Sequence, residues 1–368
     1  MTNFMGKDGF QWFVGVVEDR QDPKKLGRVR VRCLGYHTEN VNDLPSSDLP
    51  WAHPMTPITS ASVSGVGQTP LGVVEGTWVV GFFQDGEDAQ QPIIMGTLPG
   101  VPAALSTKDA DKGFQDILNG NYPKYENEPD TSRLAVNDEN NPHPTLTLRK
   151  ADRDLVVGTA QIDGVTKGVA KTKSDLDTEL SGKWSEPVTD YKAEYPHNHV
   201  METEGGHLRE YDDTVGAKRI HERHSSGTGY EIFDDGTKIT RVKKDNYNIV
   251  SADEYCHIQG TARETIDGGL RVKVNNNAQA SNNYAIEVGS GANVTIEVQN
   301  GDINLISQLG DVNLKAGKNM NIDVAQALNI KVGGAITETS KSKTESAEGT
   351  HQMNATLQDI NGNKIELN

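Results

Sequence analysis

The chain has 368 residues, of which only 35% are hydrophobic and 6% aromatic, and it carries a formal net charge of −16. This length predicts two or three domains. The small apolar share disfavours one large globular core and favours an elongated molecule with many glycines, of which there are 37. The negative charge disfavours non-specific binding to nucleic acid and to anionic membranes.

The N-terminus and the cysteines indicate how the chain is made. The N-terminus lacks the basic and apolar regions of a signal peptide, and the longest apolar run, near residues 78–83, is far too short to span a membrane. Cys33 and Cys256 lie in different regions and follow no metal-binding spacing, so we expect both thiols to be reduced. We therefore expect a soluble product that is synthesised in a cytoplasm.

Residues 1–100 predict a compact all-β domain. A first strand covers Gln11–Val17, turn residues follow at Asp22–Gly27, and Arg28–Arg32 then alternates between arginine and valine. Further short strands are expected near 50–53, 76–83 and 92–97, separated by loops rich in Gly, Ser and Pro. Five short strands in under a hundred residues indicate a small closed barrel of the OB type.

The alternating strand supplies the most suggestive candidate residues of this domain, Arg28, Arg30 and Arg32. On an OB fold they would suit contact with a nucleic-acid backbone. The other interpretations are a solvated strand face and a face that contacts a protein neighbour. We favour these two, because acids are interspersed and no ladder of stacking aromatic residues is present. The tryptophans are expected to anchor the core or an interface: Trp12, Trp51 and Trp78.

Several runs of this domain resemble the N-terminal OB domain of the central spike, or cell-puncturing, protein of contractile-tailed phage baseplates. They are Trp12–Arg20, Asp22–Val31, Leu49–Ala52, Met55–Ala61 and Val74–Val79. The architecture is similar to that of the valine–glycine repeat spike of type VI secretion. The resemblance implies that the domain trimerises and docks under a ring-shaped baseplate hub.

Residues 101–194 are polar and acidic and are punctuated by prolines, which predicts an extended linker ordered by what it lies on. One short helix is expected at Asp109–Leu118 and an extended piece at Thr145–Val157. Some members of the family have a lysozyme-like domain at this point, and such a domain needs two carboxylates held by a folded core. The acids here stand in a proline-rich segment without such a core: Glu126, Glu128 and Asp130. We therefore predict no catalytic residues and no enzyme.

Residues 195–283 resemble the collar that leads into the trimeric β-helix of the spike proteins. The resemblance rests on Tyr195–His207, Glu210–Gly216, Arg219–His221 and Glu231–Thr237. Glycines at 205, 206, 216, 227, 229 and 236 predict successive hairpins.

The histidines of the collar raise the question of a metal site. His197 and His199 would share one strand face, and threefold symmetry could then complete an axial site. The run His221–His224 is not HExxH and lacks a helix and a third ligand. Near the C-terminus His351 stands alone. We expect ordinary collar histidines, with no metal and no cofactor.

Residues 284–368 contain an apolar–polar–apolar triplet that recurs every eight or nine residues. Its central positions are 287, 295, 304, 313, 321, 329 and 337, with glycines between the triplets at 291, 301, 310, 317 and 333. Side chains alternate along a strand, so each triplet presents two apolar groups to one side. Short strands with glycine corners at a fixed period predict a stacked β-solenoid. A hairpin around an Asn-Gly turn is expected at Leu357–Leu367, as a terminal cap.

An apolar face of one strand has to be covered by another chain segment. Either one chain coils with three octads per turn, or three identical chains wrap together and each gives one side of a triangle. The resemblance favours the second closure. The predicted fold is therefore all-β: an OB barrel, a long linker, and an intertwined triple-stranded β-helix in a homotrimer.

The leading hypothesis for function is a structural spike in the virion tail baseplate. It would be made in the host cytoplasm, would dock to the hub through the OB domain, and would puncture the bacterial outer envelope on sheath contraction. A small PAAR-like tip protein is expected at its C-terminal end, and nucleic acid is not an expected partner. The alternatives are a spike of a related contractile injection system, a glycan-active solenoid enzyme such as a lyase or depolymerase, and an OB-type nucleic-acid binder.

Overall fold

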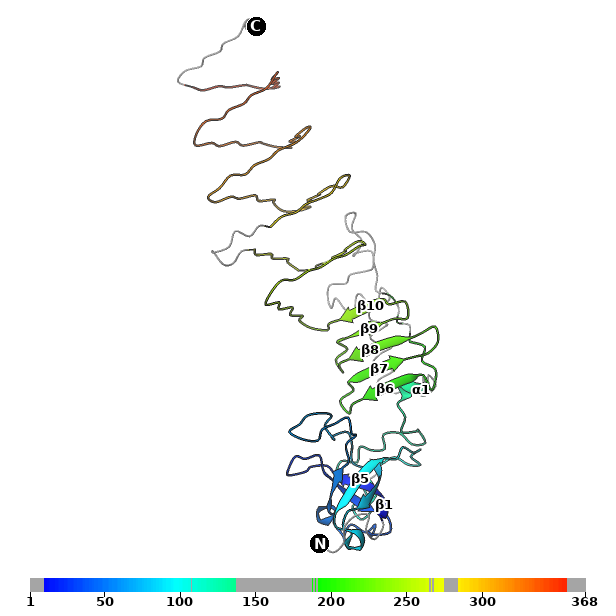
Figure 1. The fold of residues 1–368 in the computed structure, drawn as a ribbon. Coiled ribbons are helices and arrows are strands. Elements are labelled where there is room, and N and C mark those ends of the chain that lie inside the picture. Colours follow the sequence, from blue (N-terminus) through cyan, green and yellow to red (C-terminus); the bar gives the residue numbers. More distant parts are fainter. Residues whose placement is uncertain are drawn as a thin grey trace. The chain divides into compact units, whose positions relative to one another are not determined.

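The computed structural model describes residues 10–106, 108–136, 187, 189, 191–264, 266, 268–274 and 284–355. The chain divides into two compact units, Met1–Arg271 and Val272–Asn368. The first unit holds a barrel and a separate antiparallel sheet, and the second holds the octad region (Figure 1). No helix among the described residues is long and apolar enough to cross a membrane.

The N-terminal domain is a closed five-stranded barrel, as the sequence predicts. Its strands are β1 (Gln11–Asp19), β2 (Val29–Cys33), β3 (Trp51–Pro54), β4 (Trp78–Phe83) and β5 (Pro92–Thr97). They close in the order β1-β2-β3-β5-β4, with β3 and β5 parallel and the other pairs antiparallel. Two short 3-10 turns lie between strands, at Ser46–Asp48 and Gly86–Asp88.

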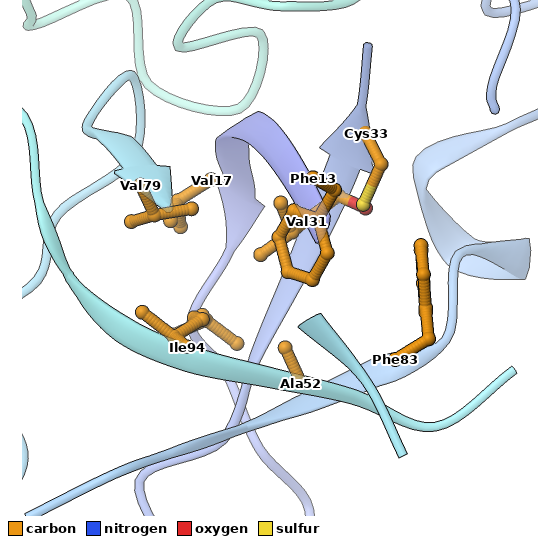
Figure 2. Packing of buried hydrophobic residues seen from close by; sticks show 9 residues of the cluster. Phe13, Val17, Val31, Cys33, Ala52, Val79, Phe83 and Ile94 are labelled. Atoms are coloured by element: carbon orange, nitrogen blue, oxygen red, sulfur yellow. The ribbon is translucent and has the colours of Figure 1, made fainter. Parts of the chain in front are cut away.

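The barrel interior is filled by alternate apolar residues of the strands (Figure 2). The cluster consists of Phe13, Val17, Val29, Val31, Cys33, Ala52, Val79, Phe83 and Ile94. Glycines let neighbouring strands approach closely: a Cβ at Gly81 would lie 2.0 Å from the carbonyl oxygen of Ile93. Both cysteines are free, Cys33 inside this core and Cys256 exposed.

Residues 99–136, which we call the strap, follow the last barrel strand and belong to the first unit. The amide of Gly113 donates to the carbonyl of Glu39 at 2.6 Å, so the strap is held on the barrel. The strap ends in the short helix α1 (Arg133–Val136), which contacts β6 of the sheet.

The helix expected at Asp109–Leu118 is wrong, because this stretch forms turns. The buried carboxylate of Asp116 accepts hydrogen bonds from the amides of Asn119 and Asn121. Such side-chain contacts compete with helical hydrogen bonds. Phe114 also has a φ of 61°, which a helix does not allow. The extended piece expected at Thr145–Val157 lies outside the described residues.

The second part of the first unit is a five-stranded antiparallel meander, which we call the collar. Its strands are β6 (Asn198–Glu202), β7 (Leu208–Asp212), β8 (Arg219–Arg223), β9 (Gly229–Ile232) and β10 (Lys238–Arg241). The turns between them contain glycines with positive φ: Gly206, Gly216, Gly227 and Gly236. The hairpins predicted from these glycines are confirmed.

The octad region consists of straight stretches separated by bends (Figure 1). In residues 284–355 turns or bends occur at 290–291, 299–301, 308–310, 317–318, 325–326, 333–334, 341 and 348–349, and five of them contain a predicted glycine corner. Bends with the same spacing also occur at 243–244, 251–252 and 259–260, so the pattern begins directly after β10, within the range expected for the collar. The hairpin expected at Leu357–Leu367 lies outside the described residues.

Candidate functional site

The arginines of β2 are held by contacts inside their own domain. The guanidinium of Arg28 donates to the two carboxylate oxygens of Asp22 at 2.7 and 3.1 Å. Together with backbone amides of the turn, Arg28 holds the pKa of Asp22 well below its usual range. Arg30 donates to the carbonyl of Leu49 at 3.1 Å, and its guanidinium lies 4.5 Å from the centre of the Trp51 ring.

The third arginine, Arg32, is completely buried. Its Nε donates to Oε1 of Glu18 at 2.6 Å, and its other nitrogens donate to the carbonyls of Thr38 and Leu44. The amide of Phe114 in the strap donates to the same Glu18 oxygen at 2.8 Å. A solvated arginine face is therefore wrong for Arg32, because the strap and the loop after β2 cover this end of the strand. All three guanidinium groups are thus engaged in contacts within the domain, so they do not form an exposed basic surface of the kind that binds nucleic acid.

The outer face of β1 and β4 is apolar, although it lies outside the barrel core. Trp12 and Trp78 are 51% and 42% exposed. Trp12 and Phe10 both lie edge-on to the ring of Phe82, at 5.8 and 5.4 Å between ring centroids. The two exposed tryptophans fit the predicted interface anchors, whereas Trp51 is half-buried.

Phe10 and Phe82 also belong to this surface, although the sequence-based prediction covers only the tryptophans. The signal that marks them is present in the sequence: Trp12–Val17 and Trp78–Phe83 are apolar at nearly every position, whereas a strand with one solvated face alternates. We call this outer face of β1 and β4, with Phe10, the aromatic face. An exposed patch of large apolar side chains is typical of a protein–protein interface.

The buried face of the collar sheet is polar and centres on Glu210. This fully buried carboxylate accepts hydrogen bonds from Asn198 at 3.1 Å and from Arg219 at 3.0 Å, and it lies 2.6 Å from Nδ1 of His221. Arg219 also donates to Glu231 at 3.0 Å. The cluster links four of the five collar strands, and Arg219 supplies the opposite charge that the buried Glu210 carboxylate requires.

The histidines singled out from the sequence are spread over different places. His221 is turned to Glu210, while His224 contacts Ser226 Oγ at 2.8 Å and packs against the ring of His207 at 4.5 Å. His199 lies 3.9 Å from Asp213 on the exposed face, and His351 lies 3.8 Å from Glu345. Across the described ranges, no three His, Cys, Asp or Glu side chains are grouped so as to hold a metal ion.

The candidate carboxylates of the strap make local structural contacts. Glu128 pairs with Arg133 at 3.1 Å, and Asp130 accepts the amide of Gly100 at 2.8 Å, whereas Glu126 is exposed. Two of the three carboxylates thus stabilise the turns of the strap through an ion pair and a hydrogen bond.

The apolar side chains of the octads are exposed in the single chain. From the triplets between Ile286 and Ile336, their exposed fractions range from 41% at Val288 to 72% at Leu305. The other members of this stripe are Ile286, Val294, Ile296, Ile303, Val312, Leu314, Met320, Ile322, Leu328, Ile330 and Ile336. A continuous apolar stripe of this length is a surface that a soluble protein covers by association.

The chain is similar to known proteins along most of its length. A family model described as the Gp5 N-terminal OB domain matches residues 35–164, which include three barrel strands and the strap. Protein Gp5 of Vibrio phage KVP40 is 38% identical over 293 residues, which cover 72% of this chain and 65% of the relative. The pre-baseplate central spike protein Gp5 of Enterobacteria phage T4 is 24% identical in an alignment 462 positions long, which covers 72% of this chain and 80% of that protein. The chain thus spans just under two thirds of the KVP40 protein.

Proposed function

We propose that this chain, which is similar to the phage Gp5 proteins and matches the model of their N-terminal OB domain, is a structural central spike of a phage tail baseplate. Three copies would form a rigid needle that docks under the baseplate hub and punctures the bacterial outer envelope when the tail sheath contracts. Its place would be the tail baseplate of the virion, with a small tip protein at the C-terminal end.

The exposed octad stripe is the observation that carries this proposal. In a single-chain coil, successive octads would cover one another's apolar faces. The side chains between Ile286 and Ile336 remain at least 41% exposed, so the described part of the chain does not cover them. Burial of apolar area contributes about 25 cal/mol per Å², and identical chains with this stripe can bury it against one another. This supports the closure by several chains.

The barrel supports the docking step. Its core is complete, yet the aromatic face remains outside it with two large tryptophans exposed. Aromatic side chains of this kind are enriched at the centre of protein interfaces. We propose that the aromatic face takes part in contact with the hub.

We propose that the spike acts mechanically and does not catalyse the cleavage of any bond. A glycosidase needs two carboxylates held across the sugar bond. Glu128 and Asp130 are instead engaged in the turns of the strap. A solenoid lyase would need acids on one solenoid face, whereas the polar centres of the octads are mostly Asn and Thr. Release of reducing ends from peptidoglycan or capsular glycans by the purified protein would contradict this part of the proposal.

The copy number is tested by sedimentation and negative-stain imaging of the full chain. We expect an elongated particle with three times the mass of one chain. Replacing two stripe residues (Leu305→Asp and Leu314→Asp together) should yield a species with the mass of one chain, because six charges would have to be buried in the trimer. The matched control places the same charges on the opposite face (Asn304→Asp and Asn313→Asp) and should leave the trimer intact. A wild-type mass near that of one chain would overturn the proposal.

A further inference from the structure

An arginine of the barrel and a glutamate of the collar meet across 184 residues of sequence. Arg20 directly follows β1, and Glu204 lies in the turn between β6 and β7. The two guanidinium nitrogens of Arg20 donate to the two carboxylate oxygens of Glu204 at 2.7 and 3.0 Å. This is the bidentate geometry in which an arginine–carboxylate pair is strongest and most directional. Both residues belong to the first compact unit.

Two more side chains complete the contact. The remaining nitrogen of Arg20, Nε, lies 3.1 Å from Oε2 of Glu75, a carboxylate that is only 1% exposed. The hydroxyl of Tyr122, in the strap, donates to Oε1 of Glu204 at 2.9 Å. Arg20 therefore sits between one carboxylate from the barrel and one from the collar, and the strap adds a third attachment. We call these four residues the clasp.

Arg20 is the residue of the clasp that pairs with both of its carboxylates. Two carboxylates face one guanidinium, so loss of Arg20 would leave two like charges close to each other. Among the described residues, Arg20 is the cation within ion-pair distance of Glu75, and a buried carboxylate without a counter-charge is costly. The pKa values agree with this arrangement: the hydrogen bond from Arg20 is the main cause that lowers the pKa of Glu204.

The strap also connects the same two parts through contacts that lie outside the clasp. At one end Phe114 donates to Glu18 of the barrel. At the other end the carbonyl of Leu134 accepts hydrogen bonds from Tyr191 at 2.9 Å and from Asn198 of β6 at 3.1 Å. A strap alone would permit the barrel to pivot, because its middle is a series of turns. A second contact at a different place removes that freedom.

We propose that the clasp locks the barrel to the first hairpin of the collar, so that barrel and collar move as one rigid body. Arg20 acts as a positioning residue that fixes the orientation of the barrel relative to the collar sheet. The lock is a property of one chain, so it holds or fails independently of the number of copies in the assembly.

The test is an intrachain cross-link across the contact. Gln21→Cys and Gly205→Cys place one thiol beside each half of the clasp, at exposed positions next to Arg20 and Glu204. The full chain also carries Cys256→Ser to remove its exposed thiol, whereas the native Cys33 is buried and burial raises the pKa of its thiol to about 12. A short bismaleimide is added, and the rate of cross-linked peptide formation in the single-chain band is measured by mass spectrometry.

We expect fast cross-linking with the intact clasp and a rate at least tenfold lower after Arg20→Ala. Arg20→Lys, which keeps a positive charge beside Glu75 but not the bidentate geometry, should lower the rate less than Arg20→Ala, and so should Tyr122→Phe. Lys24→Ala is the matched control, because it removes a positive charge from the same connection between β1 and β2, and it should leave the rate unchanged.

Two results would overturn the inference. One is an unchanged cross-linking rate in Arg20→Ala, which would mean that the strap alone fixes the orientation. The other is a slow rate with the intact clasp, which would mean that the two parts are not locked. If Arg20→Ala fails to fold, as judged by its circular dichroism spectrum, Glu204→Gln decides in its place, because it keeps one acceptor oxygen but removes the charge and the second acceptor for Arg20.

Discussion

At the residue scale, the barrel contains two oppositely charged side chains that are buried together. Glu18 and Arg32 are both fully buried and pair at 2.6 Å, with backbone partners for the remaining nitrogens. Such a pair is stable only when its hydrogen bonds are complete. The sequence predicted the alternation of this strand but not the burial of its last arginine, because the covering segment lies far along the chain at Phe114.

Asp22 supports a pH-dependent prediction. Arg28 and the turn amides lower its pKa in the folded state, so the stability it contributes is present above its unfolded pKa of about 4 and is lost as pH falls through the folded value. Asp22→Asn should lower the free energy of unfolding of the barrel by about 1–3 kcal/mol at neutral pH, since hydrogen bonds to a charged group are lost. The difference from wild type should shrink below about pH 4.

Denaturant unfolding followed by tryptophan fluorescence at a series of pH values measures this effect. Asp48→Asn removes an exposed carboxylate of the same domain and serves as the control, with little change expected. A difference between Asp22→Asn and wild type that stays constant down to pH 3 would contradict the prediction.

Elements differ in how well the sequence predicts them. The barrel strands and the collar hairpins follow from alternation and from glycines such as Gly216 and Gly236, which are local signals. The turns of the strap were predicted less well, because the side chain of Asp116 competes for the backbone amides there. The contact between Arg20 and Glu204 has no local signal at all, since it depends on how two separate sheets meet.

The strap offers a test of how tightly it closes the barrel. A Cβ at Gly113 would lie 2.1 Å from Nε of Arg32 and 2.8 Å from Oε1 of Glu18. Gly113→Ala should therefore displace the strap and lower the free energy of unfolding by about 1–3 kcal/mol, as is usual for overpacking. Hydrogen exchange at Phe114 should become faster, because its bond to Glu18 is lost.

Gly72→Ala is the matched control for this substitution. An added Cβ at Gly72 meets nothing within 4 Å, and its φ is not positive. Unchanged exchange at Phe114 in Gly113→Ala would show that the strap can shift without loosening, contrary to the expectation.

At the scale of the whole molecule, the two compact units differ in how well they cover their apolar side chains. The first unit has its own core, whereas the octads between Ile286 and Ile336 expose their apolar side chains in the single chain. The sequence predicts that this region is a repeat with apolar side chains on one face of each strand and polar side chains on the other. It could not determine the number of chains, because one chain coiled on itself and three chains wrapped together need the same pattern.

The proposed association of three chains predicts that stability depends on protein concentration. The midpoint of thermal unfolding of the full chain should rise as the chain concentration is raised, because assembly favours the folded state by mass action. The double substitution of Leu305 and Leu314 by Asp should remove this dependence. A wild-type midpoint that is the same at every concentration would contradict it.

The regular spacing of the bends has a consequence for how such a protein can change over time. Each stretch between bends at 308–310, 317–318 and 325–326 repeats the same alternation of faces. A short in-frame duplication of one whole repeat would add a layer and keep every side chain on its proper face. Gain or loss of a single residue would turn all following side chains of that stretch over. In the proposed assembly, the length of the region could therefore change only in whole repeats if every apolar side chain is to stay on its face.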